Sequence, residues 1–204
     1  MQQTITKIER QKKNKNRYSL FVGEQFIIGV SEETLLFFDI HVGKDLSNTL
    51  IEKIRTKEVY VSVREQAWRF LARREHSRSE LRDKLLNKSF PMEIIQQILT
   101  DLVKRDYLND YRYARLVLND EINLKKAGPL LIKGKLKNKG VELNIISELL
   151  EELYPEEVQI SNCRHIADKK RSLLNNLDPH KQRKRLISYL AQKGYSWDII
   201  ERSL

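Results

Sequence analysis

The chain has 204 residues, 40% hydrophobic and 32% charged, so it can bury a core but spreads that core over small modules. Its 38 basic residues against 28 acidic ones give a formal charge of +10, which favours a polyanion or an acidic protein surface as partner. The single cysteine, Cys163, excludes an intrachain disulfide, and no apolar run has the length of a membrane span or a signal peptide. We therefore expect a cytoplasmic protein with no membrane partner.

Residues 1–45 predict a small β-meander. Three short stretches rich in Ile, Val, Tyr and Phe, residues 5–10, 17–22 and 25–30, are separated by turn-forming residues. Three such strands bury too little surface for an independent domain, so we expect the sheet to pack on a helical neighbour. A short helix over residues 31–38 should follow, with Ser31 as its N-cap.

The rest of the chain predicts helices, beginning with two over residues 47–56 and 58–75. All four prolines lie where a helix would begin, a position that tolerates a missing N–H: Pro91, Pro129, Pro155 and Pro179. Further helix starts are predicted at Ser77, where Glu80 completes a capping box, at Gly128 and at Asp178. Helix ends with positive φ are predicted at Gly140 and Gly194, and Ser89 replaces the equivalent glycine earlier in the chain.

Three segments repeat the same apolar pattern. Residues 81–99, 132–150 and 186–204 align without gaps at offsets of 51 and 54 residues, and another helical stretch precedes each segment, at 58–75, 111–126 and 157–176. Self-similarity of this kind marks a repeat architecture, which offers a long surface to partners rather than a pocket to a substrate. The third unit's middle helix, starting at Asp178, should be about one turn longer than the others.

The expected fold is therefore mostly α, with three tandem three-helix, helix-turn-helix-like repeats that form an elongated curved array after the small β-meander. The predicted domains are the meander at 1–45, the first repeat with a preceding helix at 46–110, the second repeat at 111–154 and the third repeat at 155–204. The two tryptophans, Trp68 and Trp197, are expected to pack in the core or between units.

Catalytic chemistry is poorly represented. The segment 128–136 resembles a phosphate loop, but its glycines are wrongly spaced and Leu136 stands where a magnesium-binding Ser or Thr is required. Cys163 and His165 could both touch a metal, yet no second cluster is spaced to complete a zinc site. We expect no enzymatic activity, no metal and no cofactor.

Charge is segregated within the second repeat. Residues 125–139 contain six lysines and no acid, whereas residues 141–159 contain six glutamates and no base. A helix-turn-helix protein places its last helix in the negatively charged major groove of DNA, where the acidic helix over 142–153 would be repelled. Sequence-specific transcription control is therefore disfavoured.

The basic middle helices remain as candidate binding surfaces. In the second repeat, Lys133 with Lys137 and Lys135 with Lys139 form two stripes beside a seam of Ile132 and Leu136 that should be buried. A competing interpretation is that cations near helix ends, such as Lys88, Lys139 and Lys193, only complement the helix dipole. The candidate residues for binding protein or nucleic acid are Arg73, Arg74, Arg78, Arg82, Lys84, Lys125, Lys126, Lys133, Lys135, Lys137, Lys139, Lys181, Arg183, Lys184 and Arg185.

Four segments together carry a family resemblance: AWRFLARREHSRSELRDKLLNKSF (67–90), YLNDYRYAR (107–115), GPLLIKGKLKNKGV (128–141) and LISYLAQKGYSWDIIERSL (186–204). In this order and spacing they closely resemble RecX, a family of bacterial regulatory proteins that modulate the recombinase RecA. The resemblance implies a non-enzymatic protein that binds in the helical groove of the RecA filament on single-stranded DNA. It further implies restraint of ATP hydrolysis, strand exchange and the coprotease activity that induces the SOS response.

A second hypothesis stays open beside this one. The chain could bind single- or double-stranded DNA without a recombinase partner, because its basic helices would suit phosphates alone. An enzyme acting on DNA is the least favoured class. In either of the first two cases we expect a monomer.

Overall fold

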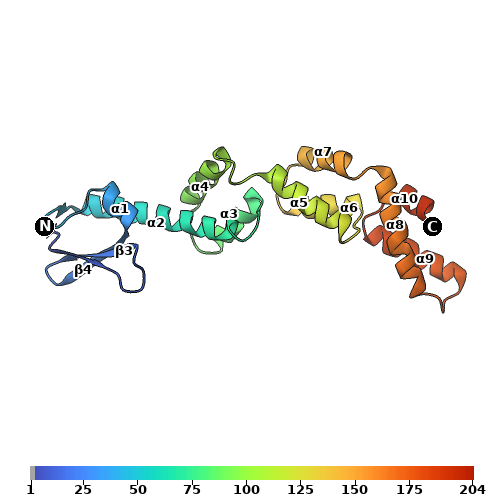
Figure 1. Cartoon of the computed structure of the whole chain (residues 1–204), viewed down its shortest axis with the longest axis horizontal. Coiled ribbons are helices and arrows are strands. Elements are labelled where there is room, and N and C mark those ends of the chain that lie inside the picture. Colours follow the sequence, from blue (N-terminus) through green and yellow to red (C-terminus); the bar gives the residue numbers. More distant parts are fainter. Residues whose placement is uncertain (1–2) are drawn as a thin grey trace. The chain divides into compact units, whose positions relative to one another are not determined.

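A computed structural model describes residues 3–204, which are mostly helical, with short antiparallel strands confined to the N-terminal part (Figure 1). In chain order the elements are β1 (Gln3–Thr4), β2 (Lys7–Arg10), β3 (Arg17–Val22), β4 (Gln25–Ser31), α1 (Glu32–Phe37), β5 (Asp45–Leu46), α2 (Asn48–Leu71), α3 (Arg78–Leu86), α4 (Met92–Lys104), α5 (Asp110–Asn123), α6 (Pro129–Asn138), α7 (Leu143–Leu153), α8 (Glu156–Ser172), α9 (Pro179–Gln192) and α10 (Trp197–Ser203). None of these helices is long and apolar enough to cross a membrane. The chain divides into two compact units: residues up to Arg73 with Lys84–Asp101, and Arg74–Asp83 with Leu102–Leu204.

The predicted meander is present and packs on a helix, as expected. Strands β2, β3 and β4 form a three-stranded antiparallel sheet, and β1 pairs separately with β5, a pairing too short to predict from its two-residue strands. Ser31 caps α1, because its Oγ accepts a hydrogen bond from the Thr34 N–H at 3.2 Å. The buried core beneath the sheet consists of Ile5, Leu20, Val30, Ile40, Leu46 and, from α2, Ile54.

The prediction of two helices over 47–56 and 58–75 is wrong, because α2 is one continuous helix of 24 residues. Ser47 caps its start, accepting from the Leu50 N–H at 3.1 Å. The β-branched Val61 and Val63 lie in its middle, where burial of both side chains outweighs their preference for strands. Tertiary packing therefore decides this segment.

The prediction that the two tryptophans pack in the core is also wrong. Trp68 is 39% exposed near the end of α2, and Trp197 is 61% exposed at the start of α10. Each has a surface position, so neither ring is a core anchor.

The three repeats are present as α2–α3–α4, α5–α6–α7 and α8–α9–α10. Their predicted middle-helix starts are confirmed: Ser77 Oγ accepts from the Glu80 N–H at 3.0 Å, Gly128 precedes Pro129 at the start of α6, and Asp178 Oδ1 accepts from the His180 N–H at 3.0 Å. Helix α9 has 14 residues against 10 in α6, so its predicted extra length is confirmed. The predicted positive φ angles are present at Gly140 and Gly194, at 74° and 89°, and Ser89, which replaces the equivalent glycine, also has a positive φ of 60°.

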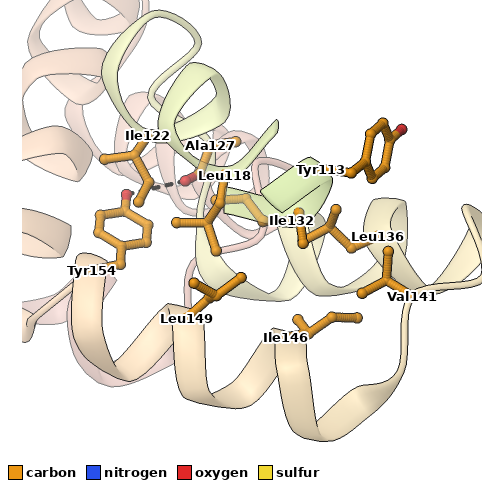
Figure 2. Close-up of a cluster of buried hydrophobic side chains, with 11 residues drawn as sticks. Tyr113, Leu118, Ile122, Ala127, Ile132, Leu136, Val141, Ile146, Leu149 and Tyr154 are labelled. Atoms are coloured by element: carbon orange, nitrogen blue, oxygen red, sulfur yellow. Dashed lines mark hydrogen bonds between the residues drawn. The ribbon is translucent and has the colours of Figure 1, made fainter. Parts of the chain in front are cut away.

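The apolar seam common to the repeats is buried, as the alignment predicts. In the second repeat, side chains from α5, α6 and α7 point toward one another and form one cluster (Figure 2). The repeated positions of the middle helices are at most 3% exposed: Leu81, Leu85, Ile132, Leu136, Leu186 and Leu190. Consequently, the lysines that flank the seam on α6 lie outside the core.

Candidate functional site

The middle helices of successive repeats contact one another end to start. The end of α9 meets the start of α6, and the end of α6 meets the start of α3. At the start of α6, the Gly128 N–H donates to the Lys193 carbonyl at 2.7 Å, and the Leu130 N–H donates to the Gly194 carbonyl at 3.0 Å. At the end of α6, the Lys139 carbonyl accepts from Ser77 Oγ at 2.5 Å. Helix α6 is therefore fixed at both ends, whereas α9 is fixed in this way only at its end.

Two glycines allow this close approach. A Cβ on Gly128 would lie 2.3 Å from the Gly194 carbonyl carbon, and a Cβ on Gly140 would lie 2.4 Å from the Ser79 Cβ. Sequence patterns identified these glycines only as helix boundaries. Their second role is to let one repeat pack on the next. That packing joins residues more than 60 positions apart in the sequence, such as Ser77 and Lys139, so no local sequence pattern predicts it.

A buried polar cluster adds to the contact between the second and third repeats. Tyr154 donates to the Ala127 carbonyl at 3.0 Å (Figure 2), and Tyr195 donates to the Lys126 carbonyl at 2.9 Å. Asn162 donates to the Ile122 carbonyl at 3.0 Å. These bonds satisfy backbone carbonyls that would otherwise be buried without partners, and burial raises the pKa of both tyrosines.

Two of the candidate lysines are tied to a buried carboxylate on α5. Lys125 Nζ and Lys135 Nζ each donate to Glu121 at 2.6 Å, and the Glu121 side chain is only 4% exposed. Burial raises the pKa of Glu121, but the hydrogen bonds from the two lysines outweigh that effect and hold the pKa below its usual value. Neither lysine is free to bind a partner without giving up this pair.

A second carboxylate, Glu80, holds two more candidates. Arg74 contacts Glu80 with two guanidinium nitrogens, at 2.8 and 2.9 Å, and Lys139 Nζ lies 3.2 Å from the same carboxylate. The hydrogen bond from Arg74 is the main cause that lowers the pKa of Glu80 to about 2. The predicted capping box is therefore only half formed, since the Glu80 carboxylate binds these cations.

The candidates around α3 also have local partners. Arg82 forms an ion pair with Asp83 at 2.9 Å, and the ammonium of Lys84 lies 5.3 Å from the ring centroid of Phe70. Arg78 contributes its backbone N–H, which donates to the Asp110 carboxylate at 2.7 Å, and its guanidinium forms no ion pair with a carboxylate in residues 3–204.

The remaining candidates form no ion pair with a carboxylate anywhere in residues 3–204. On α6 these are Lys133 and Lys137, both exposed and one turn apart. The others lie before or between helices or at the start of α9: Arg73, Lys126, Lys181, Arg183, Lys184 and Arg185. The structure therefore divides the predicted cations into an internally paired set and an available set.

The available cations of α9 border a hollow beside α8. The hollow has a volume of about 490 Å³, and Lys170, Lys184, Arg185 and Tyr189 line it. Lys170 Nζ lies 5.3 Å from the Tyr189 ring centroid, and Lys193 Nζ lies 5.5 Å from the same centroid. This surface is suited to an anion or to a nucleobase that stacks on an aromatic ring.

Groups for metal or covalent chemistry are not assembled. Within residues 3–204 no three His, Cys, Asp or Glu side chains gather where they could hold a metal ion. Cys163 is buried, and this burial raises the pKa of its thiol, which disfavours the reactive thiolate.

Comparison with known proteins identifies the family. Sequence models described as the regulatory protein RecX N-terminal domain and the first, second and third RecX three-helix domains match residues 3–47, 64–102, 109–150 and 157–204. Regulatory protein RecX of Clostridioides difficile (strain 630) is 30% identical over 200 residues, which cover 98% of this chain and 93% of that protein. This chain belongs to the RecX family.

Other RecX proteins give the same result. Regulatory protein RecX of Listeria monocytogenes serotype 4a (strain HCC23) is 33% identical over 195 residues, covering 96% of this chain and 72% of that protein. A crystal structure of regulatory protein RecX superposes with a TM-score of 0.81 at 25% identity and covers 98% of both chains. A crystal structure of RecX from Lactobacillus salivarius gives a TM-score of 0.65 at 26% identity over 71% of this chain and 94% of that one. The RecX three-helix domains are the repeats whose middle helices are α3, α6 and α9.

Proposed function

We propose that this chain is a cytoplasmic regulator that binds the RecA filament on single-stranded DNA, in the helical groove of that filament. There it restrains ATP hydrolysis, strand exchange and the coprotease activity of the SOS response. The observation that carries the proposal is the set of exposed, unpaired cations along α6 and at the start of α9, in a protein of a regulatory family. No catalytic residue has a role.

The charges next to these cations favour a mixed partner over bare nucleic acid. Helix α7 carries the exposed carboxylates Glu148 and Glu151, and Glu142 precedes it. A surface that only neutralises phosphates gains nothing from such an acidic helix, which DNA repels. A DNA strand coated with protein offers both anionic phosphates and basic side chains, so it can match both signs of charge.

The test compares binding to RecA filament and to bare single-stranded DNA by fluorescence anisotropy in matched salt. The full chain should bind filament more tightly and slow its ATP hydrolysis. The variant Lys181→Gln/Arg183→Gln/Lys184→Gln/Arg185→Gln should bind filament more weakly. If all four residues contact phosphates, the log–log salt slope should shrink by about 3 in total, from about 0.7 per contact.

A matched control removes the same charge elsewhere, in Lys53→Gln/Arg55→Gln/Arg69→Gln/Lys104→Gln, where all four side chains are exposed. This control should retain the affinity and the salt slope of the parent. Equal affinities of the parent for filament and for bare DNA would instead support DNA binding without a recombinase partner. An equal loss of filament affinity in the two quadruple variants would show that net charge, and not the position of the α9 cations, determines binding.

A further inference from the structure

We propose that the outer face of the N-terminal sheet is a separate binding site for single-stranded nucleic acid. The site combines the exposed Phe26 and its half-buried neighbour Phe21 with the basic loop over residues 11–16. It belongs to the first compact unit, whereas α6 and α9 belong to the second. The inference does not depend on a recombinase partner.

Strand register defines which residues share this face. Lys7 is paired with Phe21, which is also paired with Phe26, so these three side chains form one row across the sheet. The next row on the same face contains Glu9, Ser19 and Gly29. The opposite face carries Leu20 and the rest of the buried core. The row of aromatic residues therefore faces solvent.

The aromatic pair offers a ring for stacking. Phe26 is 54% exposed, and its ring meets Phe21 edge to face, with centroids 5.9 Å apart. Lys7 Nζ lies 5.8 Å from the Phe21 centroid, which places a cation beside the rings. Exposed aromatic rings on a sheet, flanked by cations, are the stacking surfaces that unpaired bases use in single-strand-binding proteins.

The loop at the other end of β2 supplies positive charge. Residues 7–17 contain six basic side chains and one acid, Glu9, which Lys7 neutralises at 2.6 Å. Arg17 is paired with Glu58 at 2.8 Å. The four other cations are exposed and form no ion pair with a carboxylate in the described chain: Arg10, Lys12, Lys13 and Lys15.

Backbone hydrogen bonds give this loop a defined conformation. The Gln11 N–H donates to the Arg17 carbonyl at 2.8 Å, and the Arg17 N–H donates to the Asn14 carbonyl at 3.0 Å. The guanidinium of Arg10 also donates to the Lys15 carbonyl. The cations are therefore presented by an ordered turn, which lowers the entropy lost on binding.

A hollow lies between the loop and the sheet. Its volume is about 550 Å³, and its polar lining includes Gln11 and Ser19, whose side chains hydrogen-bond at 3.3 Å. A Cβ on Gly29 would come within 2.9 Å of the Gln11 amide nitrogen, so glycine leaves room for this side chain over the sheet. Amide and hydroxyl groups at this position can bond to the edge of an unstacked base.

These features favour a single strand over a duplex or a protein. In a duplex the base faces are stacked inside, where Phe26 cannot reach them, so only the cations would contribute. An acidic protein surface would engage the lysines but has no specific use for an exposed ring beside them. A single strand uses both, because its phosphates and its base faces are accessible together.

The test measures anisotropy of a labelled oligothymidylate and of a duplex of equal length with the full chain. Phe26→Ala should weaken single-strand binding about fivefold or more and leave duplex binding unchanged. Phe37→Ala is the matched control, because Phe37 is 66% exposed, meets Phe38 edge to face and has Lys57 over its ring at 4.6 Å. It should bind both DNAs like the parent.

A second pair of variants tests the loop. Lys12→Gln/Lys13→Gln/Lys15→Gln should reduce the single-strand salt slope by about 2, whereas Lys53→Gln/Arg55→Gln/Arg69→Gln should not change it. Phe26→Leu keeps an apolar side chain without a ring, so its weakened binding, with unchanged circular dichroism, supports stacking. Equal affinities of Phe26→Ala, Phe26→Leu and Phe37→Ala for the single strand would overturn the proposal. Equal loss of slope in the two triple variants would do the same.

Discussion

Helices α6 and α9 hold the same place in successive repeats, and both are basic, but their cations have different surroundings. On α6, Lys135 is held by Glu121 and the following Lys139 by Glu80. On α9, the cations of residues 181–185 form no ion pair with a carboxylate in the described chain. Part of the positive charge of α6 is therefore neutralised by carboxylates of the same protein, whereas the cations at the start of α9 remain available to a partner.

The starts of α6 and α9 also differ in their contacts. The start of α6 is packed on the end of α9 through Gly128, whereas the start of α9 is capped only by its own Asp178. Equivalent positions in a repeat protein thus divide between holding the array together and facing a partner. This division makes the two helices separable by mutation.

The largest expected effect is that of Gly128→Ala. The added methyl group would overlap the backbone at Gly194, so the free energy of unfolding should fall by about 3 kcal/mol. Gly134→Ala is the control in the same helix, because a Cβ added to Gly134 would meet nothing within 4 Å. That change should raise stability by roughly 0.5–1 kcal/mol, since alanine favours helix. Urea unfolding of both variants measures the difference, and equal stabilities would contradict the packing role of Gly128.

The next effect concerns the ion pairs at the end of α6. Glu80→Gln should cost about 2 kcal/mol near neutral pH, because Arg74 and Lys139 lose a charged partner. The pKa of Glu80 is lowered to about 2 from 4.5, so the stability it contributes is present above pH 4.5 and is lost as the pH falls toward 2. Thermal unfolding of parent and variant should therefore converge over this range. Glu93→Gln, at an exposed position on α4, is the control, and its unfolding temperature should equal that of the parent at each pH.

Local chemistry made most of the fold predictable. Caps such as Ser31 and Asp178, and glycines such as Gly140, act within a few residues of themselves, so sequence patterns located the helix boundaries. The exception was α2, where the prediction placed a break between residues 56 and 58, whereas the helix runs without interruption from Asn48 to Leu71 and includes the buried, β-branched Val61 and Val63. Its continuity depends on neighbours distant in sequence, which local propensity does not contain.

The candidate surface was predictable only as a list of charges. The run over residues 125–139 lacks acids in sequence, yet Glu121 and Glu80 reach its lysines in space. The contact of Lys125 with Glu121 could have been suspected from their spacing of four residues, which suits a helix, whereas the contact of Lys135 with the same carboxylate spans 14 residues and has no such signal. The contact of Lys139 with Glu80 joins two repeats across 59 residues and has no sequence signal.

The smallest expected effects come from dividing the α6 lysines into two pairs. Lys135→Gln/Lys139→Gln should lower stability by about 1 kcal/mol, because Glu121 and Glu80 each lose one cation and keep another. Its affinity for the proposed filament partner should stay within about twofold of the parent, since these lysines are already occupied.

Lys133→Gln/Lys137→Gln should show the reverse pattern. Glutamine keeps good helix propensity and both positions are exposed, so the free energy of unfolding should change by less than about 0.5 kcal/mol. Two lost phosphate contacts should weaken binding about tenfold at 0.1 M salt and reduce the salt slope by about 1.4. If the lysines meet acidic side chains instead, affinity should fall with a smaller change in slope, because no condensed counterions are released. Binding equal to the parent in low salt, with circular dichroism showing a folded chain, would leave Lys133 and Lys137 as solvated residues and confine the partner surface to α9.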